Sequence, residues 1–228
     1  MINLNNYRII DLSSEILPGE SKIDGRYLHG EENQTGRPVE VTEFIAYAAR
    51  MHQMKGQTHC GTHVEGTYKY DEQGADMADM PLENYIGEAI IGDFSHKSVG
   101  QEITADELEE AGVKGGDIVL LRGKVGPSDQ RPHLSMPAVQ WLIDIKIKLL
   151  GMEFIKMSPP DTTLGTEDTD GRMLLAGIPM ADTLKGLHQI RKSRVFFIAL
   201  PLRIHLSLIH ISEPTRPRLI SYAVFCMK

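Results

Sequence analysis

Two histidines and a glutamate lie close together in residues 56–70, which read GQTHCGTHVEGTYKY. His59, His63 and Glu65 are separated by even numbers of residues, and the β-branched residues between them favour extended structure over a helix. Side chains at even spacing point to the same face of a strand, so we predict that these three converge. Two imidazoles and a carboxylate can hold a divalent metal ion and leave positions open for water. The spacing therefore predicts a metal site, and carboxylate with imidazole suits both zinc and manganese.

The segment that begins at His59 resembles the signature H-x-G-T-H-x-D-x-P-x-H of the metal-dependent cyclase family, which includes bacterial kynurenine formamidases and isatin hydrolases. The residues that match are His59, Gly61, Thr62 and His63. Glu65 stands in place of the aspartate, Thr67 in place of the proline, and Lys69 in place of the final histidine. The resemblance implies that His59, His63 and Glu65 are metal ligands. It also places Lys69 at the position that the family is thought to use for proton transfer.

Residues 171–190, GRMLLAGIPMADTLKGLHQI, resemble a second family segment that helps to hold the metals. Aligning the Leu-Leu and Gly-Ile pairs places Gly171 at a histidine of the family and Asp182 at a glutamate. The side chain of Asp182 is one methylene shorter than that of glutamate but can still coordinate a metal, whereas Gly171 has no side chain. The alternative for Asp182 is the N-cap of a helix at residues 183–191. Both interpretations of Asp182 stay open from the sequence.

The rest of the chain alternates predicted strands and helices, which indicates an α/β fold. A capping box of Thr104 and Glu107 predicts a helix at residues 105–111, and Ser135 followed by Pro137 predicts another. Strands are predicted at residues 7–13, 39–48, 51–63, 88–94, 115–122, 148–154 and 194–204. The polar residues 19–38 predict a surface loop that folds over a site. The family resemblance implies a mixed, partly barrel-like β-sheet with flanking helices, and a homodimer or homotetramer.

Composition limits the partners of this 228-residue chain. A formal charge of −7 without a cluster of basic residues argues against nucleic acid and against an anionic membrane surface. No apolar run approaches the length of a transmembrane helix, and residues 1–7 have no features of a signal peptide. We therefore expect a cytoplasmic protein with one main domain and a small-molecule partner.

The end of the chain resembles translated library DNA. Residues 206–216 read LSLIHISEPTR, which is what the transposon adapter used in sequencing libraries encodes in one reading frame. Residues 220–226, ISYAVFC, are the translation of the flow-cell adapter, in the same order and frame. We expect a single cyclase-like domain at residues 1–205, truncated at its C-terminus, followed by a non-native tail at residues 206–228.

These features favour a metal-dependent hydrolase of a small amide, formamide or cyclic amide. A divalent ion at the site would lower the pKa of bound water towards about 7 and polarise the carbonyl under attack. Lys69 could transfer a proton only if its pKa were strongly lowered; otherwise it is a cation that binds an acidic substrate or reaches solvent. The alternative is a non-catalytic family member that acts as a scaffold or small-molecule binding protein. The substitutions at positions 65, 67, 69, 171 and 182 favour that alternative, and the two retained histidines favour the enzyme.

Overall fold

The fold is built on a nine-stranded mixed sheet with the strand order β1-β15-β13-β7-β9-β11-β12-β6-β14. The computed structural model describes residues 8–14, 22–23, 26–27, 39–98, 100–126, 131–156, 165–205, 207, 209–211 and 224–227. The sheet is parallel from β7 through β9 and β11 to β12, and antiparallel on either side of that block. Its strands are β1 (Ile9–Asp11), β6 (His63–Glu65), β7 (Ile86–Asp93), β9 (Ile118–Arg122), β11 (Leu149–Glu153), β12 (Met180–Asp182), β13 (Arg194–Ala199), β14 (Ile209–Ile211) and β15 (Val224–Met227).

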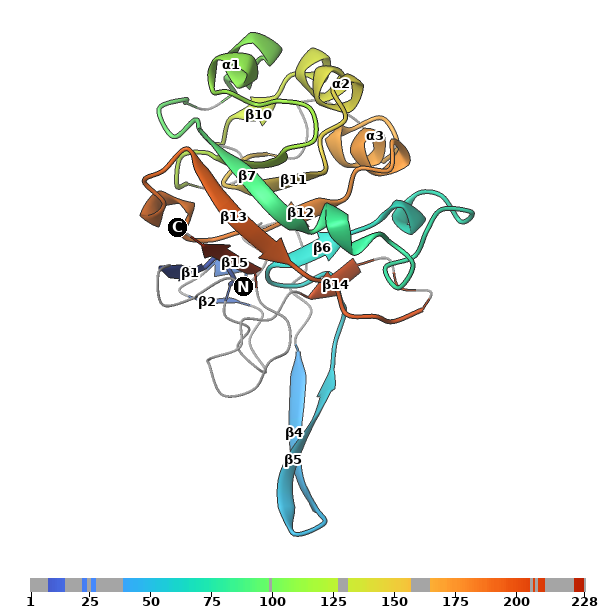
Figure 1. Cartoon of the computed structure of the whole chain (residues 1–228). Helices are drawn as coiled ribbons and strands as arrows, with labels where there is room; N and C mark the ends of the chain where they lie inside the picture. Colours follow the sequence, from blue (N-terminus) through green and yellow to red (C-terminus); the bar gives the residue numbers. More distant parts are fainter. Residues whose placement is uncertain are drawn as a thin grey trace, which may run out of the picture.

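Three short helices, α1 (Ala105–Glu110), α2 (Met136–Asp144) and α3 (Thr169–Leu175), lie together on one side of this sheet (Figure 1). Both predicted helix starts are confirmed. Thr104 and Glu107 form the capping box of α1, and the Ser135 hydroxyl accepts a hydrogen bond of 3.2 Å from the Ala138 amide at the start of α2. No described helix has the length and apolar character needed to cross a membrane.

Smaller elements complete the fold. Two pairs of very short strands lie outside the main sheet, β2 (Lys22–Ile23) with β3 (Arg26–Tyr27) and β8 (Glu102–Ile103) with β10 (His133–Leu134). Single turns of 3₁₀ helix occur at η2 (Thr67–Lys69), η3 (Leu82–Asn84) and η5 (Leu187–Gln189).

The core lies on both faces of the sheet, as the continuous apolar sequence of β9 shows. Ile118 and Leu120 pack on the face that is also lined by β6 and β13, whereas Val119 and Leu121 pack against the helices. All four side chains are fully buried. A strand covered on both sides has no polar face to alternate with, which explains the unbroken run of hydrophobic residues. The predicted mixed, partly barrel-like sheet with flanking helices is confirmed.

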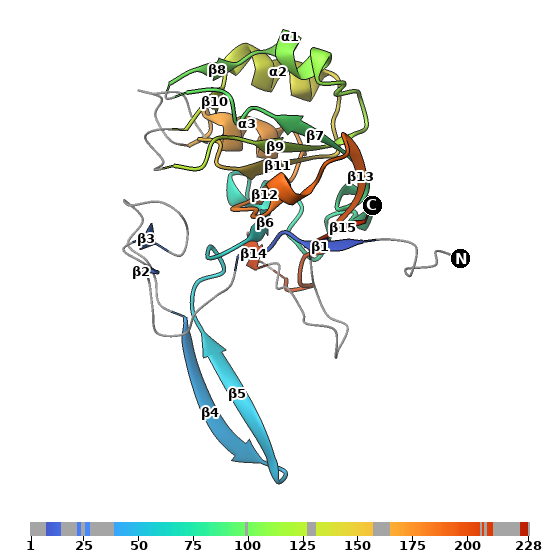
Figure 2. The same ribbon diagram turned by 90° about the vertical axis from the view of Figure 1, so that its left-hand side faces the viewer.

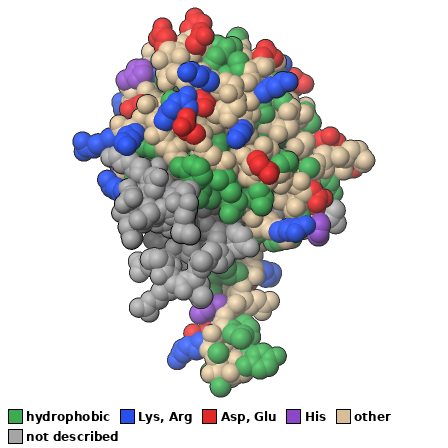
Figure 3. Space-filling model, viewed as in Figure 1, with side chains coloured by type: hydrophobic (Ala, Val, Ile, Leu, Met, Phe, Trp, Pro, Cys, Tyr) green, Lys and Arg blue, Asp and Glu red, His purple; other side chains and the backbone are tan. Residues whose placement is uncertain are grey.

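A long hairpin projects away from this body (Figures 1 and 2). It consists of β4 (Glu40–Ala46) and β5 (Ala49–Lys55), joined by Tyr47 and Ala48 with φ values of 53° and 58°. Positive φ at both turn residues matches the twist of an antiparallel pair. Hydrophobic side chains gather at the tip (Figure 3), where Ile45 and Tyr47 are 75% and 96% exposed. We refer to residues 40–55 as the arm.

The predicted strand at residues 51–63 is wrong, because it joins two elements that the structure separates. β5 ends at Lys55, residues 56–62 form bends, and β6 begins only at His63. Gly61 has a φ of 59°, a left-handed backbone that interrupts extended chain and that glycine adopts readily. His59 therefore lies in the bend at residues 56–62, whereas His63 is the first residue of β6.

Two other boundaries differ from the sequence prediction. The strand predicted at residues 194–204 ends at Ala199, before Pro201, which has no amide proton to donate to a sheet. The helix predicted at residues 183–191 is reduced to η5, because Thr183 and Gly186 both have positive φ. Asp182 is thus the last residue of β12 and not a helix N-cap. The loop predicted at residues 19–38 lies outside the described residues, apart from β2 and β3.

Two strands of the main sheet fall within residues 206–228. β14 pairs antiparallel with β6, and β15 lies between β1 and β13. β14 is therefore the immediate neighbour of the strand that carries His63 and Glu65.

Candidate metal centre

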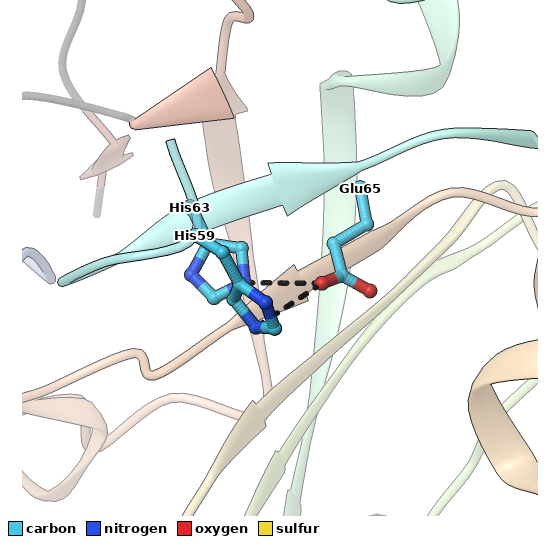
Figure 4. Close-up of side chains that lie close together, drawn as sticks. All are labelled: His59, His63 and Glu65. Carbon is cyan, nitrogen blue, oxygen red and sulfur yellow. Dashed lines mark hydrogen bonds and ion pairs between the residues drawn. The ribbon is translucent and has the colours of Figure 1, made fainter. Parts of the chain in front are cut away.

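The three predicted ligands converge, although not along one strand. His63 and Glu65 lie two residues apart on β6 and are fully buried, while His59 reaches the same point from the preceding bend (Figure 4). Glu65 Oε1 lies 3.2 Å from His63 Nε2 and 3.5 Å from His59 Nε2. One donor atom from each residue lies within 4.8 Å of the other two. Two imidazole nitrogens and a carboxylate oxygen at such separations fit one divalent cation.

The bend at residues 56–62 is held in place by the Thr62 hydroxyl. This oxygen accepts a hydrogen bond of 2.7 Å from the Ser14 amide and donates one of 2.7 Å to the Thr183 carbonyl. Ser14 follows β1 and Thr183 follows β12, so the hydroxyl joins the bend to two distant parts of the sheet. Thr62 thereby fixes the backbone between His59 and His63.

The orientation of the His63 ring is set by the Gly61 carbonyl. His63 Nδ1 lies 2.9 Å from this oxygen, and a carbonyl only accepts hydrogen bonds, so Nδ1 carries a proton. The other nitrogen, Nε2, faces Glu65. A ring whose Nδ1–H is bound to a backbone carbonyl presents Nε2 in the manner usual for metal-binding histidines.

Charge in the site favours an ionised Glu65. Burial alone would raise the pKa of this carboxyl, but the hydrogen bond and charge of His63, when both of its ring nitrogens carry protons, and the charge of Lys69 outweigh it and lower the pKa to about 2. A metal ion at Nε2 would take the place of that second proton. The pKa of His63 is raised, because the hydrogen bond and charge of Glu65 outweigh burial, which acts in the opposite direction. A buried carboxylate that stays charged is suited to binding a cation.

Lys69, at the end of η2, does not reach freely into solvent. Its ammonium Nζ lies 2.7 Å from Glu65 Oε2 and 3.0 Å from Asp170 Oδ2, and its side chain is 16% exposed. Burial lowers the pKa of Lys69, but the charges of Glu65 and Asp170 outweigh it, so the net shift is upward. The structure thus shows no lowering of the pKa of the kind that proton transfer by Lys69 requires.

Asp170 is the site residue that sequence reasoning missed. It lies on α3, is 7% exposed, and burial together with the charge of Glu65 raises its pKa to about 7. The family resemblance pointed to Gly171, but a Cβ on Gly171 would clash with the backbone of Gly165 and Thr166. The only sequence signal for Asp170 is that an acidic residue directly precedes that position.

Asp182 lies close to the centre but outside the group of three ligands. It is paired with His63 across the antiparallel β6 and β12, and its charge helps to raise the His63 pKa. Its Oδ1 accepts a hydrogen bond of 2.6 Å from the Thr183 amide. A metal-binding role for Asp182 stays a prediction.

A second group of possible ligands among the described residues consists of Asp76, Asp79 and His205. Asp76 Oδ1 already accepts hydrogen bonds from the backbone amides of Ala78 and Asp79. Asp79 and His205 are not buried. This arrangement is that of an ordinary turn stabilised by an aspartate.

Comparison with known proteins shows the family of the chain. A family model described as "Putative cyclase" matches residues 10–159, which is more than half of the chain. This chain belongs to the cyclase family. Members of the cyclase family with similar sequences include a protein named kynurenine formamidase from Erythrobacter litoralis. It is 28% identical over 214 residues, which is 86% of this chain and 88% of the relative.

Two further comparisons place this cyclase-family chain among proteins of related sequence and fold. A kynurenine formamidase of Bacillus cereus is 31% identical over 109 residues, which is 45% of this chain and 50% of the relative. The structure of isatin hydrolase A from Ralstonia solanacearum superimposes with a TM-score of 0.72 at 18% identity, over 98% of this chain and 92% of the other. At that identity the structural likeness shows the shared fold.

Proposed function

We propose that this cyclase-family protein is a metal-dependent hydrolase of a small amide, formamide or cyclic amide. The observation that carries the proposal is the convergence of His59, His63 and Glu65, whose possible ligand atoms all lie within 4.8 Å of one another. The names of its relatives, kynurenine formamidase and isatin hydrolase, support an amide-type substrate. Zinc and manganese are the two ions that we propose for the centre.

We assign metal binding and electrostatic stabilisation to different residues of the chain. A divalent ion, when bound, supplies Lewis acidity for a carbonyl and acidifies water. His59, His63 and Glu65 would hold it, with the His63 ring fixed by the Gly61 carbonyl. Lys69 contributes a fixed positive charge beside Glu65 that attracts an anionic substrate group or the developing negative charge of the reaction. We retain Lys69 as a candidate for the reaction in this electrostatic role rather than as a base.

The proposal includes a cytoplasmic homodimer or homotetramer. The arm supports self-association, because its exposed hydrophobic tip is a surface that a second copy of the chain can cover. The cytoplasm is the expected location, since only two cysteines occur in the chain and they provide no disulfide framework.

A panel of N-formyl aromatic amines and cyclic amides tests the activity. The protein is loaded with zinc or with manganese, and product formation is followed by liquid chromatography. We expect turnover by the loaded protein and loss of turnover in His63→Ala. His52→Ala is the matched control, because His52 lies on the arm and pairs with Glu43, so this variant should keep its activity.

The second candidate function is small-molecule binding without turnover. The specific observation in its favour is that Lys69, at the proposed proton-transfer position, is engaged by two carboxylates. If the loaded protein hydrolyses nothing in the panel, and Lys69→His does not restore hydrolysis, the non-catalytic function replaces the enzyme.

A further inference from the structure

The two oxygens of the Glu65 carboxylate face different groups. Oε1 lies 3.2 Å from His63 Nε2 and 3.5 Å from His59 Nε2, on the side proposed for the metal. Oε2 lies 2.7 Å from the Lys69 ammonium. Glu65 is therefore a bridge between the imidazole group and a fixed positive charge.

Asp170 completes the surroundings of that charge. Its Oδ2 lies 3.0 Å from Lys69 Nζ, whereas its buried Oδ1 has no hydrogen-bond partner among the described residues. Burial removes the solvation of a carboxylate oxygen, so such an oxygen favours a nearby cation or hydrogen-bond donor. The helix N-cap keeps Asp170 in this place, since Asp168 Oδ1 accepts a hydrogen bond of 2.9 Å from the Gly171 amide.

We propose that the Lys69 ammonium is an internal second cation, which occupies the position between Glu65 and Asp170 and restricts the centre to one divalent ion. This inference rests on the proposed function, because it assumes an ion at His59, His63 and Glu65. An ammonium and a divalent ion on the two sides of one carboxylate already compensate its charge. A further divalent ion beside Lys69 would be repelled at short range in a buried site, where water screens little.

Removal of the ammonium should open a second cation position. Without Lys69, Glu65 Oε2 and both oxygens of Asp170 become available, so the new ligand set consists of carboxylate oxygens. Such a set suits harder ions such as manganese or magnesium better than the imidazole-rich first position does. The second position should therefore prefer other ions than the position at His59, His63 and Glu65.

The experiment compares the metal content of the wild type, Lys69→Ala, Lys69→Arg and the double variant Lys69→Ala/Asp170→Asn. Each protein is saturated with manganese, freed of excess ion, and analysed by plasma mass spectrometry and titration calorimetry. We expect one ion per chain in the wild type and in Lys69→Arg, two ions in Lys69→Ala, and one again in the double variant. Lys97→Ala is the matched control, because Lys97 is also largely buried and paired with a glutamate, at 2.6 Å from Glu107.

Thermal unfolding gives a second readout. Excess manganese should raise the melting temperature of Lys69→Ala by several degrees more than that of the wild type, since binding stabilises the folded state. If Lys69→Ala does not fold, Lys69→Gln removes the charge while keeping a long side chain, and its metal content decides the matter. One ion per chain in every neutral Lys69 variant overturns the inference, as do two ions in the wild type. A wild type that binds none contradicts the proposed function itself.

Discussion

At the scale of single residues, Glu65 links the two histidines of the centre to the Lys69 ammonium. It touches His59, His63 and Lys69, and through Lys69 it is linked to Asp170. A glutamate has one methylene more than the aspartate of the family signature, and here its carboxylate reaches both the imidazoles and the ammonium. Glu65 therefore supplies negative charge and also contacts both the imidazole of His63 and the ammonium of Lys69.

The first prediction concerns the ligands. His63→Ala and Glu65→Ala should abolish metal binding, a loss of at least about 100-fold in affinity, because each removes a proposed ligand. Asp182→Ala should only weaken binding, since Asp182 lies beside His63 on the neighbouring strand. Calorimetric titration with zinc measures all three, and chelation should lower the wild-type melting temperature. Full occupancy in His63→Ala would contradict the assignment.

The second prediction concerns pH and His133, a buried residue away from the centre. Burial lowers its pKa below 6.5, more than the nearby Glu102 raises it, and its Nδ1 has no hydrogen-bond partner among the described residues. As the pH falls, His133 therefore takes up a proton in the unfolded chain at a higher pH than in the folded protein. The free energy of unfolding should decrease as the pH falls below 6.5.

Denaturant unfolding at about pH 7.5 and about pH 5.5 tests this sign. The wild type should lose more stability on acidification than His133→Gln, which cannot take up the proton. Equal losses in the two proteins would show that His133 is not responsible.

At the scale of elements, the bend at residues 56–62 decides where His59 lies. A strand would have carried the chain past the site, whereas the left-handed Gly61 turns it back so that the rings of His59 and His63 are 4.6 Å apart between centroids. Thr62 joins this bend to the residues after β1 and β12. The element that positions His59 is thus irregular but firmly attached.

The third prediction follows from that attachment. Thr62→Val keeps the shape but leaves the buried Ser14 amide without the hydroxyl that it donates to, and the Thr183 carbonyl keeps only the donor Ser14 Oγ. This loss should cost about 1–3 kcal/mol of unfolding free energy. Metal affinity should fall as well, because His59 loses its fixed backbone. Chemical denaturation and zinc titration measure the two effects. Thr42→Val, on the exposed arm, is the control and should leave both unchanged.

The fourth prediction concerns the arm. Replacing Ile45 and Tyr47 by aspartate should shift the protein from an oligomer to a monomer, because charges at an apolar interface oppose its burial. Analytical ultracentrifugation measures the mass in solution. Glu40→Lys, at the base of the arm, is a surface change that should leave the oligomer intact. An unchanged mass in the double variant would exclude the tip as the contact.

At the scale of the whole molecule, the last strands of the sheet come from the segment whose sequence matches adapter DNA. β14 and β15 pair with β6, β1 and β13, so residues 209–211 and 224–227 take part in the sheet. A short apolar strand such as β15 pairs readily with an open strand edge, whatever its origin. We retain the proposal of a single domain at residues 1–205 with a non-native tail.

The fifth prediction tests that origin. Amplification of the locus from source DNA, without library adapters, should give a different sequence after residue 205. A protein that carries this genomic ending should melt at a higher temperature and aggregate less than the chain as written, because its own last strand would cover the sheet edge. Recovery of the LSLIHISEPTR codons from genomic DNA would contradict the proposal.

The sequence by itself determined the features that depend on neighbouring residues. The caps of α1 and α2 and the doubly buried β9 could be predicted, because each follows from side-chain chemistry within a few positions. The ligand roles of His59, His63 and Glu65 stay predictions of the same kind. The resemblance added the family and its sheet. None of these features needed knowledge of how distant segments pack.

The tertiary structure alone decided the contacts between distant segments. Lys69 and Asp170 are 101 residues apart, and they meet only because α3 packs near η2 beside β6. The sequence also gave no sign that Gly61 would take a left-handed φ, since glycine adopts either hand and the ties from Thr62 to Ser14 and Thr183 select one. The charge balance of the centre, and with it the proposed number of metal ions, is therefore a property of the packed molecule.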